Sequence, residues 1–145
     1  MPELAVNRRA SFDYEIAEKF TAGIVLSGHE AKSAKQGRMD IAGSHALLRG
    51  GEVYLVGATI QSFQPGNAPA GYDATRVRKL LLKRDEVGYL TGKLRAGLTL
   101  VPLRAYTHRS FVKLELGLGK GRKKGDKREV IKKREVEREI RRLAG

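Results

Sequence analysis

The last 27 residues of the chain, from Gly119 to Gly145, limit what the rest can fold into. They hold 12 Lys and Arg residues against 5 Asp and Glu, a net charge of +7 out of +13 for the whole chain. Apolar side chains are few there, so this segment cannot bury enough surface to offset its own ordering entropy. We therefore expect a folded body at residues 1–119 and a basic tail at 120–145 that is disordered when free.

The tail nevertheless has the pattern of a conditional helix. Asp126 and Glu129 have capping-box spacing, and no Gly or Pro occurs between Lys127 and Ala144. A helix over those residues would be about 27 Å long. The tail is either an arm that becomes helical on a polyanion or a solvated extension that aids solubility, and the excess of one charge sign favours the arm.

Composition excludes several classes of protein. The chain has no Cys, which removes disulfides and thiolate metal sites, and no apolar run long enough to span a membrane. Its N-terminus lacks the apolar stretch of a secretion signal, so we expect a cytoplasmic protein. A pI near 10.3 points first to nucleic acid and second to an anionic membrane surface. The narrow apolar stripe of the tail, without aromatic residues, disfavours the membrane.

The body shows the patterns of short strands. About six strands and two short helices are expected. The strands fall at 12–16, 22–26, 41–48, 53–60, 98–106 and 111–118, and the helices at 30–35 and 85–96. A Gly-Gly pair at 50–51 predicts a hairpin. This content predicts a mainly β (α+β) fold, a small closed or partly open antiparallel barrel with flanking helices, an architecture that often binds oligonucleotides.

Glycine and proline residues mark the ends of these elements and the irregularities within them. Gly37 and Gly97 should end the two helices, and Gly57 should mark a bulge or bend within its strand. Pro102 requires a strand edge or a bulge. The glycines at 117, 119 and 121 lack the spacing of a phosphate-binding loop, and we expect them to form a flexible joint between body and tail.

No constellation of catalytic residues is visible. The three histidines, at 29, 45 and 108, are isolated from one another and from carboxylates, and no motif of a nucleophile or a metal site occurs. We therefore expect no catalytic residues, no metal and no cofactor.

Two basic clusters are the candidate binding residues. They lie near the N-terminus and around a run of three leucines. Their members are Asn7, Arg8, Arg9, Arg76, Arg78, Lys79, Lys83 and Arg84, with Leu80 and Leu81 between them. Such a cluster is either a rim that follows phosphates beside apolar groups that contact unpaired bases, or an ordinary amphipathic boundary with solvated cations.

Several motifs in order along the chain carry a family resemblance. They are Asn7-Arg8-x-Ala10, Gly28-x-Glu30-x-Lys32-Ser33, Arg76-x-Arg78-Lys79-Leu80-Leu81-Leu82, Leu98-Thr99-Leu100-Val101-Pro102-Leu103 and Lys120-Gly121-Arg122-Lys123-x-x-Asp126-Lys127-Arg128. With these, the chain resembles the SmpB family (SsrA-binding proteins), the small protein partners of transfer-messenger RNA in bacterial ribosome rescue. Each motif alone is weak, but the ordered set is specific.

The resemblance implies an oligonucleotide-binding-type (OB-fold) barrel that is monomeric, and an RNA-binding adaptor rather than an enzyme. It implies binding of the tRNA-like domain of transfer-messenger RNA, delivered to stalled ribosomes for trans-translation. The RNA-facing residues would include Asn7, Arg8, Lys32, Leu80 and Leu81. The tail would contact small-subunit ribosomal RNA near the decoding centre and lie as a helix in the empty mRNA channel, through Lys120, Lys123, Lys124, Asp126, Lys127, Arg128, Lys132, Lys133 and Arg134.

The chain also departs from the family pattern. Thr21 stands where the family usually has an acidic residue, and Lys83 stands where a neutral polar residue is usual. Two other hypotheses stay open on the sequence. One is a general ribosome- or structured-RNA-binding barrel without specificity for transfer-messenger RNA, and the other is an RNA-processing enzyme, which would need a catalytic constellation that the sequence does not show.

Overall fold

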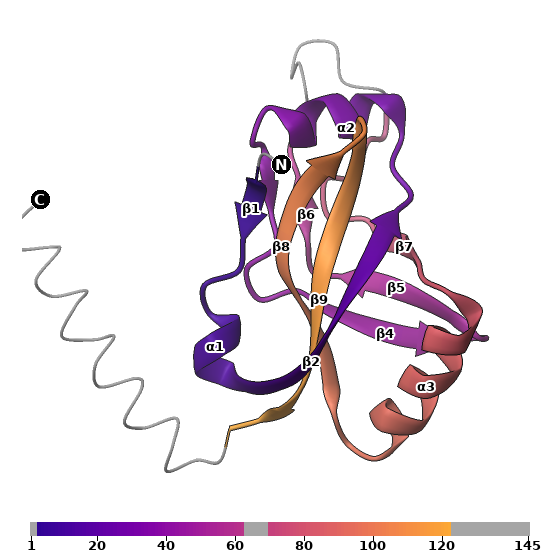
Figure 1. The fold of residues 1–145 in the computed structure, drawn as a ribbon. Helices are drawn as coiled ribbons and strands as arrows, with labels where there is room; N and C mark the ends of the chain where they lie inside the picture. The colour runs from indigo at the N-terminus through magenta and orange to yellow at the C-terminus, as the bar shows by residue number, and fades with distance from the viewer. Residues whose placement is uncertain (1–2, 63–69, 123–145) are drawn as a thin grey trace, which may run out of the picture.

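A computed structural model describes residues 3–62 and 70–122 of the chain. The described part contains nine strands and three helices (Figure 1). In chain order these are β1 (Glu3–Val6), α1 (Ala10–Asp13), β2 (Tyr14–Ile24), α2 (Gly28–Lys35), β3 (Met39–Asp40), β4 (His45–Arg49), β5 (Glu52–Val56), β6 (Thr59–Ile60), β7 (Arg78–Leu81), α3 (Arg84–Arg95), β8 (Thr99–His108) and β9 (Phe111–Gly121). None of the helices in this described part is long and apolar enough to cross a membrane.

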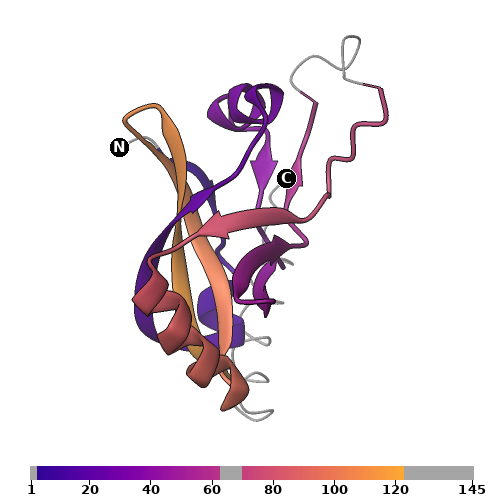
Figure 2. The same ribbon diagram turned by 90° about the vertical axis from the view of Figure 1, so that its right-hand side faces the viewer.

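Seven of the strands form one antiparallel sheet that curls round on itself. The order is β1-β8-β4-β5-β7-β2-β9, and β9 pairs again with β8, so the pairings run round a ring (Figure 2). The ring is thin in two places, because β4 meets β8 at the pair Ala46 and Leu100, and β7 meets β2 at the pairs Leu81–Gly23 and Leu80–Ile24. The predicted mainly β fold with flanking helices is confirmed, with a ring of strands that is not closed as a barrel.

The core fills the inside of this ring. Val112, Leu114, Leu116 and Leu118 alternate along β9 and are all buried, as the sequence pattern predicted. Helix α3 covers one side of the core and inserts Leu90, which is fully buried. Outward-facing residues of the same strands are left free to form a surface, which is where a binding site can be built.

The predicted helices are confirmed, and their ends follow from local chemistry. Helix α2 begins after Ser27, whose side chain accepts from the Glu30 amide at 3.1 Å, while the Glu30 carboxylate accepts from the Ser27 amide at 3.0 Å. Gly37 and Gly97 follow α2 and α3 with φ of 78° and 96°, a conformation that favours glycine at a helix end.

The predicted turns and irregularities are also present. Gly50 and Gly51 connect β4 and β5 with φ of 61° and 78°, as a tight hairpin requires. Gly57, with φ of 87°, separates β5 from β6, so the predicted strand over 53–60 is interrupted at that residue. The register of β8 against β9 shifts between Pro102 and Arg104, which is the bulge expected at a proline within a strand.

The first predicted strand, over 12–16, is wrong in its first half. Residues Ala10–Asp13 form the short helix α1, held by amides of Phe12 and Asp13 that both donate to the Arg9 carbonyl at 3.0 Å. From Tyr14 the chain then runs as one strand to Ile24, because it pairs along most of that length with β9. Long-range pairing has here overridden the polar composition of the middle of the strand.

The expectation of a flexible joint at residues 117–121 is also wrong. Gly117 and Gly119 are buried residues of β9, paired with β2 and β8. A Cβ on Gly119 would lie 2.5 Å from the Glu15 carbonyl oxygen, so glycine is needed there for close approach of two strands rather than for flexibility.

The ordered body extends past residue 119. Lys120 and Gly121 belong to β9, and Arg122 donates from its backbone to the Asp13 carbonyl at 3.0 Å. The Arg122 guanidinium also donates to the Ser11 carbonyl, at 2.8 Å from Nη2. The helix predicted after Lys127 and most of the loop predicted at 64–74 lie outside the described residues.

Candidate nucleic-acid interface

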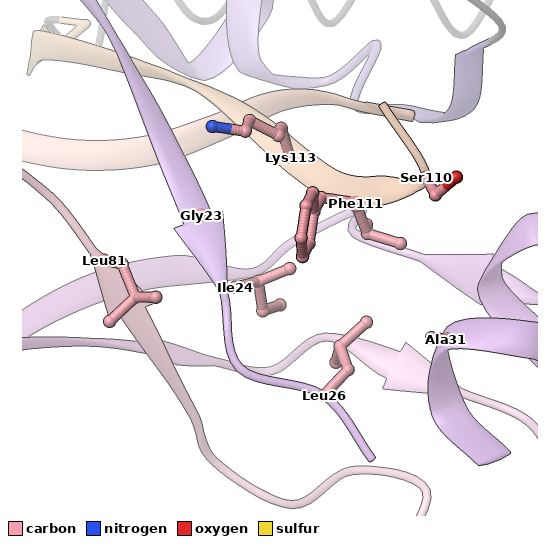
Figure 3. A pocket seen from close by; sticks show the side chains of 9 residues that line it. Gly23, Ile24, Leu26, Ala31, Leu81, Ser110, Phe111 and Lys113 are labelled. Carbon is pink, nitrogen blue, oxygen red and sulfur yellow. The ribbon is translucent and has the colours of Figure 1, made fainter. Parts of the chain in front are cut away.

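Two hollows open side by side on the outer surface where β2 and β7 end and β9 begins. The first, of about 400 Å³, is shown in Figure 3 and is mainly apolar, lined by Ile24, Leu26, Ala31, Phe111 and Val112 among others. The second, of about 570 Å³, is more polar and is lined by Lys19, Phe20, Thr21, Leu82, Lys83 and Glu86. Both are also lined by Gly23, Leu81 and Lys113, so they form one continuous surface, which we call the β2–β9 face.

The strand geometry explains why these side chains point outward. Along β7, Arg78 and Leu80 face inward and are 0% and 3% exposed, while Leu81 is 53% exposed. Gly23 is paired with both Leu81 on β7 and Lys113 on β9. Because Gly23 has no side chain, the surface stays open between those two neighbours.

Lysines dominate the charge of the β2–β9 face. Lys19, Lys83 and Lys113 line the second hollow against one carboxylate, Glu86. That carboxylate accepts from the Lys83 backbone amide at 3.1 Å, as part of the capping box of α3. Lys19 is 3.9 Å from Glu115, whereas no ion-pair partner of Lys83 or Lys113 occurs among the residues that the structure describes. The face therefore combines available cations with exposed apolar groups, which suits phosphates and unpaired bases.

Two arginines of the predicted rim, Arg76 and Arg78, form ion pairs within the protein. Glu30 is fully buried in α2 and accepts from Arg78 Nη2 at 2.8 Å and Nε at 3.1 Å, and from Arg76 Nε at 3.0 Å. Arg76 Nη2 also donates to Glu30. The remaining Arg78 donors reach the carbonyls of Ala58, Ala74 and Arg76 at 2.9–3.1 Å. This buried cluster joins α2 to β7.

The cluster shifts the acidity of its carboxylate. Burial by itself would raise the pKa of Glu30, but the hydrogen bonds from Arg76, from the Ser27 amide and from Arg78 outweigh burial and lower the pKa to about 2. The carboxylate therefore stays ionised at neutral pH, where it forms ion pairs with both arginines.

Two members of the predicted RNA-binding set lie inside the protein and not on its surface. Arg78 and Leu80 are buried, and Arg76 is largely engaged by Glu30. Alternation along a strand, with Arg78 and Leu80 two residues apart, was the signal in the sequence that could have placed them inside. A buried arginine is rare, however, and the partner that makes it possible, Glu30, is 48 positions away in the chain.

The other predicted residues lie on several parts of the surface. Lys79 is half-buried on β7 and binds Glu52 at 2.8 Å. Asn7 is only 8% exposed, and its side-chain amide donates to the Pro102 carbonyl at 2.8 Å, so it holds the chain against β8. Arg8 and Arg9 are exposed next to α1, and Lys32 is exposed on α2. Of the predicted set, Leu81 and Lys83 are the residues that the β2–β9 face brings together.

Sequence reasoning missed Lys19, Lys113 and Phe111 as candidates. Each stands alone in a strand pattern, so no local cluster distinguishes it. Their position relative to Leu81 and Lys83 comes from the pairing of β2 with both β7 and β9. Among the predicted tail residues, Lys120 is described, as an exposed member of β9, and the others lie outside the described residues. No group of three His, Asp or Glu residues suited to a metal occurs in the part of the chain that the structure describes.

The chain is similar to known proteins over nearly its whole length. The chain is 48% identical over 140 residues to the SsrA-binding protein of Gloeobacter violaceus, covering 96% of this chain and 91% of that protein. It is 46% identical over 141 residues to the SsrA-binding protein of Cupriavidus pinatubonensis, with 97% and 94% coverage. A chain of the solved structure described as "tmRNA-SmpB: a journey to the center of the bacterial ribosome" superposes with a TM-score of 0.69 at 42% identity, covering 87% of this chain and 92% of that one.

The ring of strands with its cationic and partly apolar outer face defines a small RNA-binding protein of the oligonucleotide-binding type. The family model described as "SmpB protein" matches residues 4–145. The chain belongs to the SmpB family.

Proposed function

We propose that this protein is a non-enzymatic RNA-binding adaptor of bacterial ribosome rescue. It binds the tRNA-like domain of transfer-messenger RNA and delivers that RNA to stalled ribosomes for trans-translation in the cytoplasm. The observation that carries the proposal is the match, at 42% identity over 87% of this chain, to a protein solved as tmRNA-SmpB in connection with the bacterial ribosome. The names of the SsrA-binding relatives support the same partner.

In this proposal the β2–β9 face grips the RNA. Lys83 and Lys113 contact phosphates, and Leu81 lies against bases or sugars. Additional cations at the edges of the body, Arg8, Arg9, Lys32 and Lys79, contribute to the electrostatic attraction. Buried Asn7, Arg78 and Leu80, together with the half-buried Arg76, support this surface from inside the protein. In this proposal the protein acts by positioning RNA rather than by changing it.

In this proposal the tail binds the ribosome. Its cations, from Lys123 to Arg134 and beyond, contact ribosomal RNA of the small subunit once the mRNA channel is empty. Arg122 is bound to the body, because its backbone amide donates to the Asp13 carbonyl and its guanidinium donates to the Ser11 carbonyl. In this proposal, ribosome binding by the tail can be separated from transfer-messenger RNA binding by the body.

A gel-shift titration tests the proposal. The full-length protein is titrated against the acceptor domain of transfer-messenger RNA, with an ordinary tRNA as competitor. We expect the acceptor domain to be retained at tRNA concentrations that would displace a non-specific complex. Equal competition by tRNA would instead support a general structured-RNA-binding protein, and turnover of the RNA in purified material would support an enzyme.

A further inference from the structure

The first hollow of the β2–β9 face has a shape and composition that a phosphate contact does not require. Its walls are the side chains of Ile24, Leu26 and Val112, with Ala31 of α2 on the far side. At its mouth stands Phe111, whose side chain is directed toward Ile24 in Figure 3. Phe111 is 70% exposed, the most exposed of the large apolar residues in the described part of the chain. Together with the exposed Leu81 and the apolar lining of the hollow, this ring forms a contiguous apolar patch, which is a feature of binding sites.

The hairpin between β8 and β9 fixes this ring. Phe111 pairs with His108, and the turn between them consists of Arg109 and Ser110 with φ of 49° and 68°. Neither residue is a glycine, so the turn is held in a sparsely populated conformation by the pairing of the two strands. Phe111 shares its outward direction with Lys113, two residues further along β9.

The lysines around the hollow favour a ligand that carries negative charge. Lys113 lines the apolar hollow and the neighbouring polar one, where Lys19 and Lys83 are found. An aliphatic protein segment would fill the hollow but leave Lys83 and Lys113 without counter-ions. A nucleotide satisfies both parts, because its base is flat and largely apolar on its faces and its phosphate is anionic.

We propose that this hollow holds one unpaired base of the bound RNA, stacked on the Phe111 ring, with the adjacent phosphate near Lys113. The proposal rests on the proposed function, since it names how that same surface holds its RNA. It adds a base-binding subsite, formed by Phe111, Ile24 and Leu26, to a face that otherwise binds the backbone. A volume of about 400 Å³ is at the small end of the range for ligand pockets and suits a single base.

Substitutions at Phe111 separate stacking from simple apolar contact. We expect Phe111→Tyr to bind the transfer-messenger RNA acceptor domain like the wild type, because it keeps the ring. Phe111→Ala should bind about 5- to 150-fold more weakly, and Phe111→Leu should be closer to Ala than to Tyr. The salt dependence should be unchanged in all three, whereas Lys113→Gln should reduce the log–log salt slope by about 0.7 to 0.9. Val6→Ala, a change at an exposed apolar residue of β1, serves as the control and should bind normally.

A second measurement identifies the base. Abasic sites are introduced one at a time at the unpaired nucleotides of the acceptor domain, and each RNA is titrated with wild-type protein and with Phe111→Ala. At the nucleotide that occupies the hollow, the abasic RNA should bind wild-type protein as weakly as Phe111→Ala binds intact RNA, with no further loss when both changes are combined.

The outcomes distinguish the subsite from the function. Normal binding by Phe111→Ala, or equal binding by the Leu and Tyr variants, overturns the subsite and leaves the proposed function intact, and the hollow would then be a protein-docking surface. If the wild type binds a single-stranded oligoribonucleotide in a Phe111-dependent way but not the acceptor domain, the subsite stands and the partner is another RNA. Failure to bind either RNA overturns both.

Discussion

The substitution Glu30→Gln isolates the buried cluster that fixes α2 to β7. Glu30 and Arg78 are both fully buried, and the carboxylate oxygen Oε2 accepts from Arg78 at 2.8 Å and 3.1 Å. Gln keeps the size of the side chain but removes its charge, so Arg78 becomes a buried cation without a counter-ion. Breaking a buried ion pair in this way costs about 3–5 kcal/mol.

The pH dependence gives an independent value for the same interaction. The pKa of Glu30 is lowered from 4.5 to about 2 in the folded protein. A carboxylate with a depressed pKa stabilises the fold above its unfolded value, and this stabilisation is lost as pH falls from about 4.5 to 2. A difference of about 2.5 pKa units corresponds to about 3 kcal/mol, which is the same order as the cost of removing the charge.

The assay is urea unfolding of the wild type and Glu30→Gln at several pH values between 7 and 2. We expect the variant to be less stable by about 3 kcal/mol or more at pH 7, and the difference to shrink toward zero near pH 2, where the wild-type carboxyl is itself protonated. Comparing the two proteins removes the contribution of other carboxyl groups. Glu52→Gln is the matched control, because its partner Lys79 and its own side chain are exposed, and it should change stability far less.

Two results would refute this reasoning. One is a variant as stable as the wild type at pH 7, which would mean that the arginines find other partners at no cost. The other is a stability difference that stays constant down to pH 2, which would mean that the charge of Glu30 is not what the variant removes. If the variant fails to fold at pH 7, the test is made on the wild type alone, whose stability must fall as pH decreases from about 4.5 to 2.

Three further contacts can be tested by substitution or deletion. Gly119→Ala should lower the free energy of unfolding, measured in urea, by about 1–3 kcal/mol or more, because its Cβ would be 2.5 Å from the Glu15 carbonyl oxygen. Gly121→Ala is the control, since its Cβ would have nothing within 4 Å, and equal stability of the two variants would contradict the close approach of the strands. Arg78→Ala should weaken RNA binding in proportion to its loss of stability, without changing the slope of log affinity against log salt concentration. Lys83→Ala should keep its stability and lower that slope by about 0.7 to 0.9, and a lower slope for Arg78→Ala would show that Arg78 contacts RNA. Deletion of residues 123–145 should leave binding of the acceptor domain near normal and abolish the tagging of stalled nascent chains, measured in a reconstituted translation reaction; the cut follows Arg122 because that residue bonds to Ser11 and Asp13, and loss of acceptor-domain binding would count against a separable tail.

Part of this protein is determined by local sequence. The helices at α2 and α3, the glycines that end them and the Gly-Gly hairpin were predictable, because each depends on residues a few positions apart. The alternation in β9 likewise predicted its buried face, and Pro102 predicted a bulge. The family resemblance also depends on residue identity and order alone, which is why the sequence by itself is sufficient to name the RNA partner.

Tertiary structure decided which of the basic residues are available. Arg76, Arg78, Lys79 and Lys83 are equal as charges in the sequence. In the fold, however, Glu30 binds the buried Arg78 and the half-buried Arg76, and Glu52 binds Lys79 at the surface. The partners lie 27 to 48 positions away, so strand alternation could indicate that Arg78 is buried, but no local pattern could identify the carboxylates that bind these cations. In the same way, Phe111, Lys113 and Leu81 become one surface because β2 pairs with both β7 and β9. Charge and periodicity are properties of the chain, whereas the burial of a charge and the neighbours of an exposed ring are properties of the fold.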